Sequence, residues 1–171
     1  MSWITDTWIS NTDFDKFRYP ASAINNFTEI IELSTEKYLK RLLGIELYSL
    51  FNDNFTNNTN TVRFSSLRDG EIFEKQNGDT WEFEGLKEMC QLFAMYEEKQ
   101  NPYGFNEIGI SYDAGNNEDR VNSVVQKQIA NKLYADARTK YWNVKYYLLE
   151  KIDIFPEWKF SEIENIKAIN Y

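Results

Sequence analysis

The feature that most constrains the fold is a long amphipathic segment at residues 117–151. Apolar side chains recur in it every three or four residues, which is the period of one helix face. This stripe comprises Val121, Val124, Val125, Ile129, Leu133, Ala137, Tyr141, Val144 and Leu148. About 32 residues at 1.5 Å each predict a rod of roughly 48 Å. A chain of 171 residues suits one domain of ordinary size, so this helix exceeds what the domain needs.

Two further stretches predict helices. Residues 26–53 carry apolar side chains at helical spacing, and Gly44 stands where a helix C-terminus is expected, so a break there is predicted, with one continuous helix as the alternative. Residues 85–100 are apolar beyond a single stripe, which is typical of a central helix. The stretch 52–61 is rich in Asn and Thr and predicts a polar loop. We therefore expect a mainly α fold, a small helical bundle with one long C-terminal helix, a minor β-hairpin and extended terminal arms.

The hairpin is predicted where Asn77-Gly78 separates EIFEK from TWEF. Asn-Gly supplies the positive φ angles that a two-residue type I′ turn requires. Closing the turn there places Ile72 opposite Phe83, and Ile72, Trp81 and Phe83 then share one face. An isolated two-stranded ribbon is marginal, so this face must lie on helices or on another subunit.

We divide the chain into an N-terminal arm (1–22), a helical domain (23–151, with the hairpin at 71–84) and a C-terminal arm (152–171). Both arms hold large aromatic side chains without a helical period. They either fold back over the domain or dock on a neighbouring subunit. Docking is the favoured interpretation for the C-terminal arm, because Pro156 directs it away from the long helix. The candidate interface residues are Trp3, Trp8, Trp81, Phe83, Phe155, Trp158 and Phe160.

The composition excludes several kinds of chemistry. The chain has no His, which removes His-dependent catalysis and His-ligated zinc. Cys90 is its single cysteine, so no internal disulfide can form. Paired carboxylates are inevitable among 27 acidic residues and do not by themselves make a catalytic cleft. We predict no catalytic residue, no cofactor and no metal site.

Charge and hydropathy bear on partners. Nineteen basic and 27 acidic residues give a net charge of −8, which argues against a module that grips nucleic acid. The first residues lack the pattern of a signal peptide, and no apolar run approaches the length of a membrane span. The sequence thus predicts a protein without membrane or nucleic-acid binding.

Three phrases carry a resemblance to a known family: YLKRLLGIELYSLF, DTWEFEGLKEMCQLFAMYEEKQ and YWNVKYYLLEKI, which together span residues 38–151. Their order resembles that of the head–tail connector (adaptor, or ring) proteins of tailed bacteriophages, especially crAss-like and other phages of Bacteroidetes. The hairpin and the C-terminal arm are not carried over from that family.

The resemblance implies a virion protein of the neck or tail region, assembled in the host cytoplasm and without enzymatic activity. It implies a homo-oligomeric ring, typically of twelve copies, that contacts the portal protein and adjacent tail or ring proteins. DNA would pass through the ring without being specifically bound. One alternative is an acidic helical inhibitor that mimics DNA in the host cytoplasm. Another is a hydrolase that uses acids alone, which no sequence feature supports.

Overall fold

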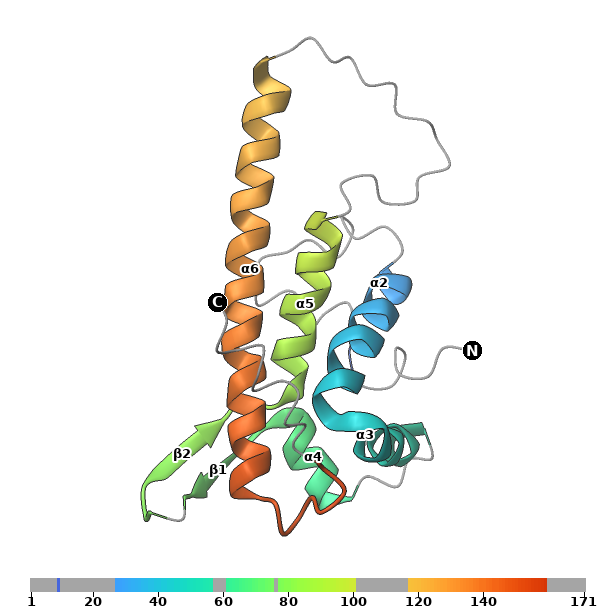
Figure 1. The fold of residues 1–171 in the computed structure, drawn as a ribbon, viewed down its shortest axis with the longest axis vertical. Coiled ribbons are helices and arrows are strands. Elements are labelled where there is room, and N and C mark those ends of the chain that lie inside the picture. The colour runs from blue at the N-terminus through green and yellow to red at the C-terminus, as the bar shows by residue number, and fades with distance from the viewer. Residues whose placement is uncertain (1–8, 10–26, 57–60, 76, 101–116, 160–171) are drawn as a thin grey trace.

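The longest element of the computed structural model is α6 (Asn117–Glu150), a helix of 34 residues that follows the predicted segment. At 1.5 Å per residue it is about 51 Å long, and its N-terminal part extends beyond the end of α5 (Figure 1). The described residues are 9, 27–56, 61–75, 77–100 and 117–159. Within them the chain is mainly helical, with one antiparallel hairpin and a long C-terminal helix, which confirms the predicted fold class.

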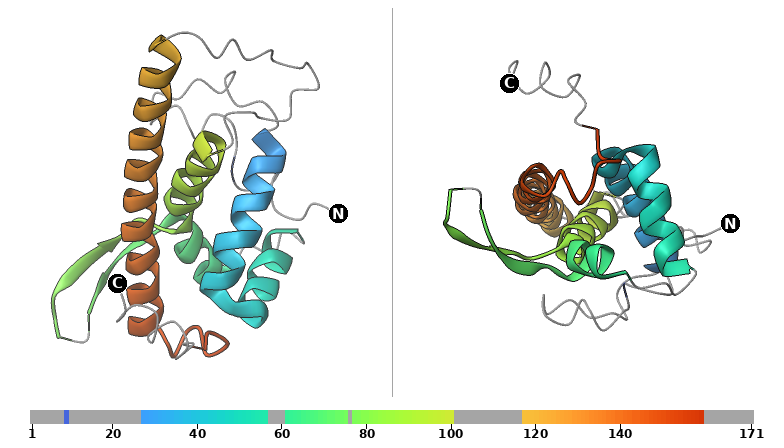
Figure 2. Two further views of the ribbon diagram at one scale, coloured as in Figure 1. Left: turned by 45° about the horizontal axis from the view of Figure 1, so that its top comes forward. Right: turned by 90° about the horizontal axis from the view of Figure 1, so that it is seen from below.

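Helix α5 (Leu86–Gln100) lies at the centre of the bundle, between α6 and the N-terminal helices (Figures 1 and 2). Its buried residues form almost a continuous run from Met89 to Met95. A helix that is apolar nearly all round must be covered on several sides, and α5 packs against both α6 and α2 (Phe27–Ser34). The predicted central helix is thus confirmed.

The N-terminal helical region is broken as predicted at Gly44. Helix α2 continues through a π-helical turn (Thr35–Leu39) into α3 (Lys40–Thr56). Gly44 interrupts α3 with φ of 76° and ψ of 165°, which are not helical angles. Only glycine adopts such a conformation readily. The rest of α3 therefore runs across the end of the bundle instead of along it (Figure 1).

The predicted polar loop at 52–61 is wrong for residues 52–56, because helix α3 continues to Thr56, while residues 57–60 lie outside the described residues. A short helix that the sequence did not predict, α4 (Val62–Asp69), begins at Val62. The Asn54 side-chain oxygen accepts hydrogen bonds from the backbone N–H and the hydroxyl of Thr61, both at 2.9 Å, at the start of α4. With only two buried residues, Phe64 and Leu67, α4 gives a weak periodic signal.

The hairpin of β1 (Glu71–Glu74) and β2 (Thr80–Phe83) exists, but its predicted register is wrong by one residue. Phe73 pairs with Trp81, and Ile72 pairs with Glu82. The reason is a three-residue loop, 76–78, closed by a hydrogen bond of 2.8 Å from the Lys75 N–H to the Asp79 carbonyl. A one-residue shift moves side chains to the opposite face, so Ile72 is 71% exposed instead of packed.

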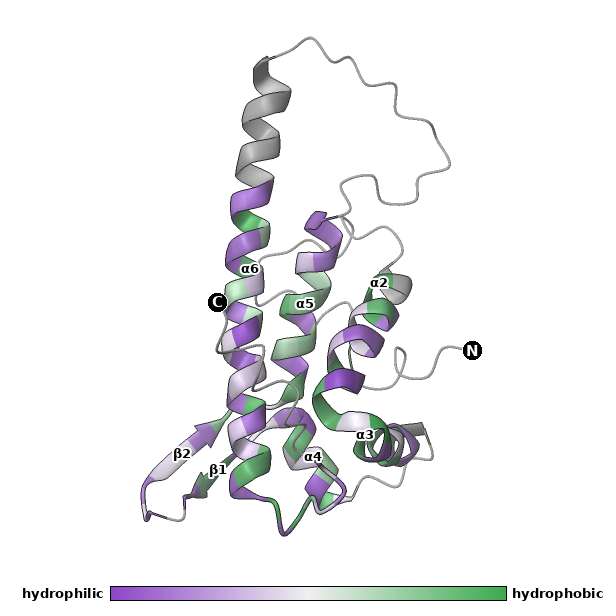
Figure 3. Ribbon diagram, in the orientation of Figure 1, coloured by the Kyte–Doolittle hydropathy of each residue, from purple (hydrophilic) through white to green (hydrophobic). Residues whose placement is uncertain are grey.

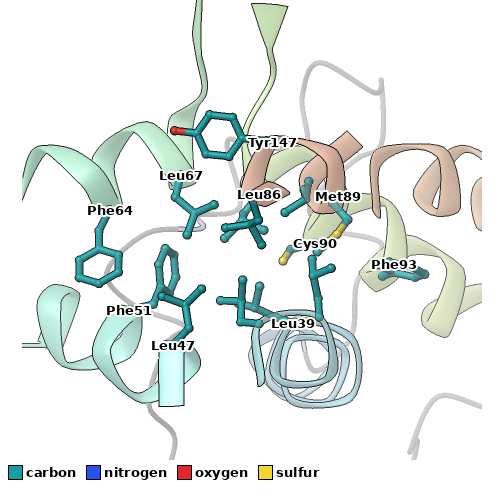
Figure 4. Packing of buried hydrophobic residues seen from close by; sticks show 14 of the residues in the cluster. Leu39, Leu47, Phe51, Phe64, Leu67, Leu86, Met89, Cys90, Phe93 and Tyr147 are labelled. Atoms are coloured by element: carbon teal, nitrogen blue, oxygen red, sulfur yellow. The ribbon is translucent and has the colours of Figure 1, made fainter. Parts of the chain in front are cut away.

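A single core joins these elements. Figure 4 shows Leu39, Leu47 and Phe51 from the N-terminal helices facing Leu86 and Met89 of α5. Green apolar segments accordingly line the inner sides of the bundle, while α6 carries purple polar turns along much of its length (Figure 3). The core therefore occupies the lower half of the molecule in these views and leaves one side of α6 outside it.

Candidate interaction surface

The hairpin is held on α6 mainly by Tyr147. The Tyr147 ring stacks on Phe83, with centroids 3.9 Å apart and planes at 10°, and meets Phe73 edge-on at 5.4 Å. Its hydroxyl donates a hydrogen bond of 2.8 Å to the carboxylate of Glu71. A two-stranded ribbon gains its stability from such packing, so Tyr147 fixes the position of the hairpin.

The Glu71 carboxylate also faces Lys151, whose Nζ lies 3.4 Å away. Burial acts to raise the pKa of Glu71, but the hydrogen bonds from Tyr147 and Ser66 and the charge of Lys151 outweigh it and lower the pKa. Burial and the hydrogen bond to Glu71 raise the pKa of Tyr147. At neutral pH the Glu71 side chain is therefore a carboxylate that accepts a hydrogen bond from the neutral phenol of Tyr147 and faces the Lys151 side chain.

The outward side of α6 carries a second apolar stripe. Trp142, Tyr146 and Leu149 are spaced by four and three residues, so they lie on one face of the helix. They are 44%, 40% and 47% exposed, respectively. We call these three residues the α6 outer stripe. Clustered large apolar side chains on a surface mark an interaction site more often than scattered ones do.

The hairpin extends this surface on one side. Half-buried Trp81 meets Tyr146 edge-on, with ring centroids 4.9 Å apart. The Lys75 ammonium lies 4.9 Å from the Trp81 centroid and 5.0 Å from that of Tyr146. On α6 itself, Lys145 Nζ lies 4.9 Å from the Trp142 centroid, but Lys145 is buried. Lys75 is therefore the cation that lies against the aromatic rings at this edge of the surface.

The charge of this helix differs from that of the whole chain. Residues 127–149 contain five basic side chains and one acidic one, Asp136. Residues 61–100, in contrast, contain nine acidic and five basic side chains. Over its full length, 117–150, the helix has six basic and four acidic residues, so it carries a small positive charge on an acidic protein. This asymmetry favours electrostatic docking.

A groove of about 560 Å³ lies between α5 and α6, on another side of α6. Its apolar walls include Leu92, Met95 and Leu133, and its charged rim includes Lys132 and Asp136. Lys140 at one end pairs with Glu84 and lies 3.4 Å from Glu88. The groove is open, and the residues that line it do not include a converging set of catalytic groups.

Two of the predicted interface residues belong to the core instead. Phe155 is fully buried, and Trp158 is 3% exposed. The Trp158 indole N–H donates a hydrogen bond of 2.9 Å to the carbonyl of Leu42, close to the break at Gly44, where helix carbonyls lose their intrahelical donors. The expectation that the C-terminal arm projects away from the domain is therefore wrong for residues 152–159.

An ion pair explains why this segment folds back. The Arg63 guanidinium of α4 binds the Glu157 carboxylate at 3.1 Å and the Ile154 carbonyl at 3.0 Å. The same guanidinium lies over the Phe64 ring, 4.4 Å from its centroid. These contacts hold the chain around Pro156 against α4, an element that the sequence did not predict.

The remaining candidates divide into three groups. Phe83 is buried against Tyr147 and is unavailable to a partner, while Trp81 stays at the surface beside Tyr146. Trp3, Trp8 and Phe160 lie outside the described residues. In the N-terminal arm the structure describes Ile9, which is buried in the core.

The α6 outer stripe was missed because the helix was analysed for the face that packs inward. A usable signal was present: Trp142, Tyr146 and Leu149 repeat at helical spacing but fall outside the inward stripe. An amphipathic helix with a second apolar stripe has more than one packing partner. The structure adds the decisive fact, that this second stripe is left exposed.

Among the described residues, no three His, Cys, Asp or Glu side chains gather into a group that would hold a metal ion. Of the helices in that part of the chain, none combines the length and apolarity of a membrane span. Comparison with family models, with curated proteins and with solved structures found no match to this chain.

Proposed function

We propose that this protein is a structural subunit of a head–tail connector in a tailed bacteriophage, forming a ring of identical copies below the portal. Its partners are then further copies of itself, the portal protein and neighbouring ring or tail proteins. The copy number of twelve comes from the family resemblance. In this role the chain links capsid to tail and lines a channel through which DNA passes.

The observation that carries the proposal is the α6 outer stripe on a helix that extends past its own bundle. Trp142 and Tyr146 are the most exposed aromatic side chains in the part of the chain that the structure describes, and Leu149 beside them is 47% exposed. A ring subunit needs a long, accessible flank to meet its neighbour. The small positive charge of α6 on an acidic chain also favours assembly from like subunits.

A DNA-mimicking inhibitor is supported less well. Mimicry needs a continuous negative face, and the longest element of this chain has five basic residues against one acidic residue between positions 127 and 149. The acids of α5 and the hairpin are interrupted by Lys75, Lys87 and Lys99. This alternative is kept only as an outcome of the experiment.

Mass spectrometry of purified virions tests the proposal directly. We expect this chain in the particle at a fixed ratio to the portal protein, and symmetric density for it at the neck in a reconstruction. Its absence from virions, together with co-purification from infected cells with a host nuclease, would contradict the connector role and favour the inhibitor.

A further inference from the structure

We propose that the α6 outer stripe binds a different surface on a second copy of this chain, the exposed side of α3, in a head-to-tail contact. We define this α3 face by Ile45, Glu46, Leu50 and Asp53, all exposed. The inference rests on the proposed function, because it names the partner surface within that ring. The argument uses three properties of the two faces: apolar content, charge and position.

The α3 face has an apolar residue at each edge, because Ile45 and Leu50 are five residues apart and flank Glu46 and Asp53 on the exposed arc of the helix. Ile45 is 77% exposed and Leu50 is 37% exposed, while Leu47 and Phe51 of the same helix point into the core. The exposed apolar pair therefore lies on the side of α3 that its own chain does not cover. Side chains of this kind pack as ridges between those of a partner helix.

The two faces differ in charge. Residues 45–53 contain two acids and no basic residue, while the α6 outer stripe has Arg138 at one end and Glu150 at the other. Glu46 meets Lys159 of its own chain at 3.1 Å, but both side chains are more than half exposed, so water screens that pair. On the outward side of α6, the cations include exposed Arg138 one turn before Trp142. Its guanidinium lies over the ring of Tyr134, 6.0 Å from the centroid.

A two-fold pairing of α6 with α6 would close a dimer and leave the α3 face unused, whereas the proposed ring requires a contact between unlike faces. Pairing the α6 outer stripe with the α3 face also brings Arg138 toward Asp53 or Glu46. The proposed ring therefore selects the heterologous arrangement.

The positions of the faces fit a chain of contacts. Helices α6 and α3 occupy opposite flanks of the molecule, with α5 between them (Figures 1 and 2). A contact between unlike faces leaves one face of each kind open at every step, so it generates a ring or a filament. The α3 face is nine residues long, about 13 Å, so a helix contact roughly 10 Å wide offers on the order of 130 Å². A stable interface needs about 800 Å² per partner, so the hairpin and the elements beside both helices must contribute most of the area.

Charge reversal of the full chain tests the contact. Sedimentation velocity measures self-association of the wild type, of Arg138→Glu, of Asp53→Lys and of the double variant at physiological salt. Each single variant should weaken self-association about tenfold or more, because it opposes like charges across the contact. The double variant, in which the charges are exchanged, should return to within about threefold of the wild type. Circular dichroism melts verify that each variant is folded.

The matched control is Lys132→Glu, which makes the same charge change on exposed α6 surface but at the α5–α6 groove. This variant should self-associate like the wild type. A mixing experiment adds a second criterion. A chain blocked on α6 by Trp142→Glu and a chain blocked on α3 by Leu50→Glu should each be monomeric and should form a one-to-one dimer when mixed.

Several results would overturn the inference. The first is a wild type that stays monomeric at 200 µM, a concentration on the order of that needed to populate weak contacts. The second is that the single variants associate as the wild type does. The third is that the double variant does not regain self-association. Duplex DNA binding that Arg138→Glu abolishes would assign the basic face to nucleic acid instead. Virions that contain the chain, with charge variants incorporated normally, would refute this contact alone. Confirmed association of a chain absent from virions would refute only the connector role.

Discussion

Replacing Phe155 by alanine should destabilise the free protein strongly, although this residue lies outside the helical bundle in sequence. The side chain is fully buried, with the rings of Tyr147 and Phe64 at centroid distances of 6.1 Å and 6.4 Å. Truncating a buried phenylalanine to alanine removes about 3–5 kcal/mol, through lost burial and the cavity left behind. We expect a loss in this range, because two aromatic neighbours on different elements cannot both move to fill the space.

The assay is urea unfolding of the full chain, monitored by circular dichroism at a protein concentration where it is monomeric. With a slope of about 2 kcal/mol per molar urea, the midpoint should fall by about 1.5–2.5 M. The thermal midpoint should fall by about 6–20 °C, since a chain of this length loses about 2–4 °C per kcal/mol.

The neighbouring residue supplies the control. Ile154 precedes Phe155 but is 44% exposed, so Ile154→Ala should change the unfolding free energy by less than about 1 kcal/mol. If Phe155→Ala unfolds at the same urea concentration as Ile154→Ala, residues 152–159 do not belong to the core, and the reasoning from burial is refuted.

Three further predictions concern a close backbone approach, a buried thiol and a titrating carboxylate. Gly85→Ala should prevent stable folding, because at its φ of 83° an added Cβ would lie 2.4 Å from the Arg68 carbonyl oxygen. Gly78→Ala has a similar φ of 88°, but its Cβ would make only an ordinary contact of 3.8 Å with the Glu74 side chain, so it should cost only about 1–3 kcal/mol in urea unfolding. Equal losses would contradict the crowding argument. Burial raises the pKa of the Cys90 thiol, so a thiol reagent should label the native protein at least about 100-fold more slowly than the urea-unfolded protein, and rapid stoichiometric labelling in native buffer would refute this. The pKa of Glu71 is lowered in the folded state, so the stability it contributes is full above its unfolded pKa of about 4.3 and is lost as the pH falls through the folded value. The difference in thermal midpoint between wild type and Glu71→Gln should therefore narrow from pH 6 to pH 3, and a constant difference would count against this role.

Local periodicity predicted the helices whose stripes are long. The segment at 117–151 corresponds to α6 and the one at 85–100 to α5, because a stripe of many apolar residues leaves few other ways to bury them. The break at Gly44 was also readable, since a glycine at a helix end has a specific backbone role. Helix α4 could not be predicted from the sequence, because its two buried residues make too short a periodic pattern.

The hairpin shows where local rules fail. Asn77-Gly78 marked the turn correctly, but both two-residue and three-residue loops accept glycine at a position of positive φ. The choice between them was made by Tyr147, which stacks on Phe83 and contacts Phe73 from a distant part of the sequence. Register therefore depended on a tertiary contact that no local pattern encodes.

The candidate surface divides in the same way. The sequence by itself determined that large aromatic residues are abundant, 12 Phe, 11 Tyr and five Trp, and that some of them stand outside the predicted helices, in the terminal arms. Only the tertiary structure decided which aromatic residues are buried in the core. Phe155 and Trp158 are buried because their segment is held on the domain by two hydrogen bonds, from Arg63 to the Ile154 carbonyl and from the Trp158 indole to the Leu42 carbonyl. Trp142, Tyr146 and Leu149 stay exposed. Burial is a property of how elements meet in space, so amino-acid type alone cannot assign a side chain to the core or to an interface.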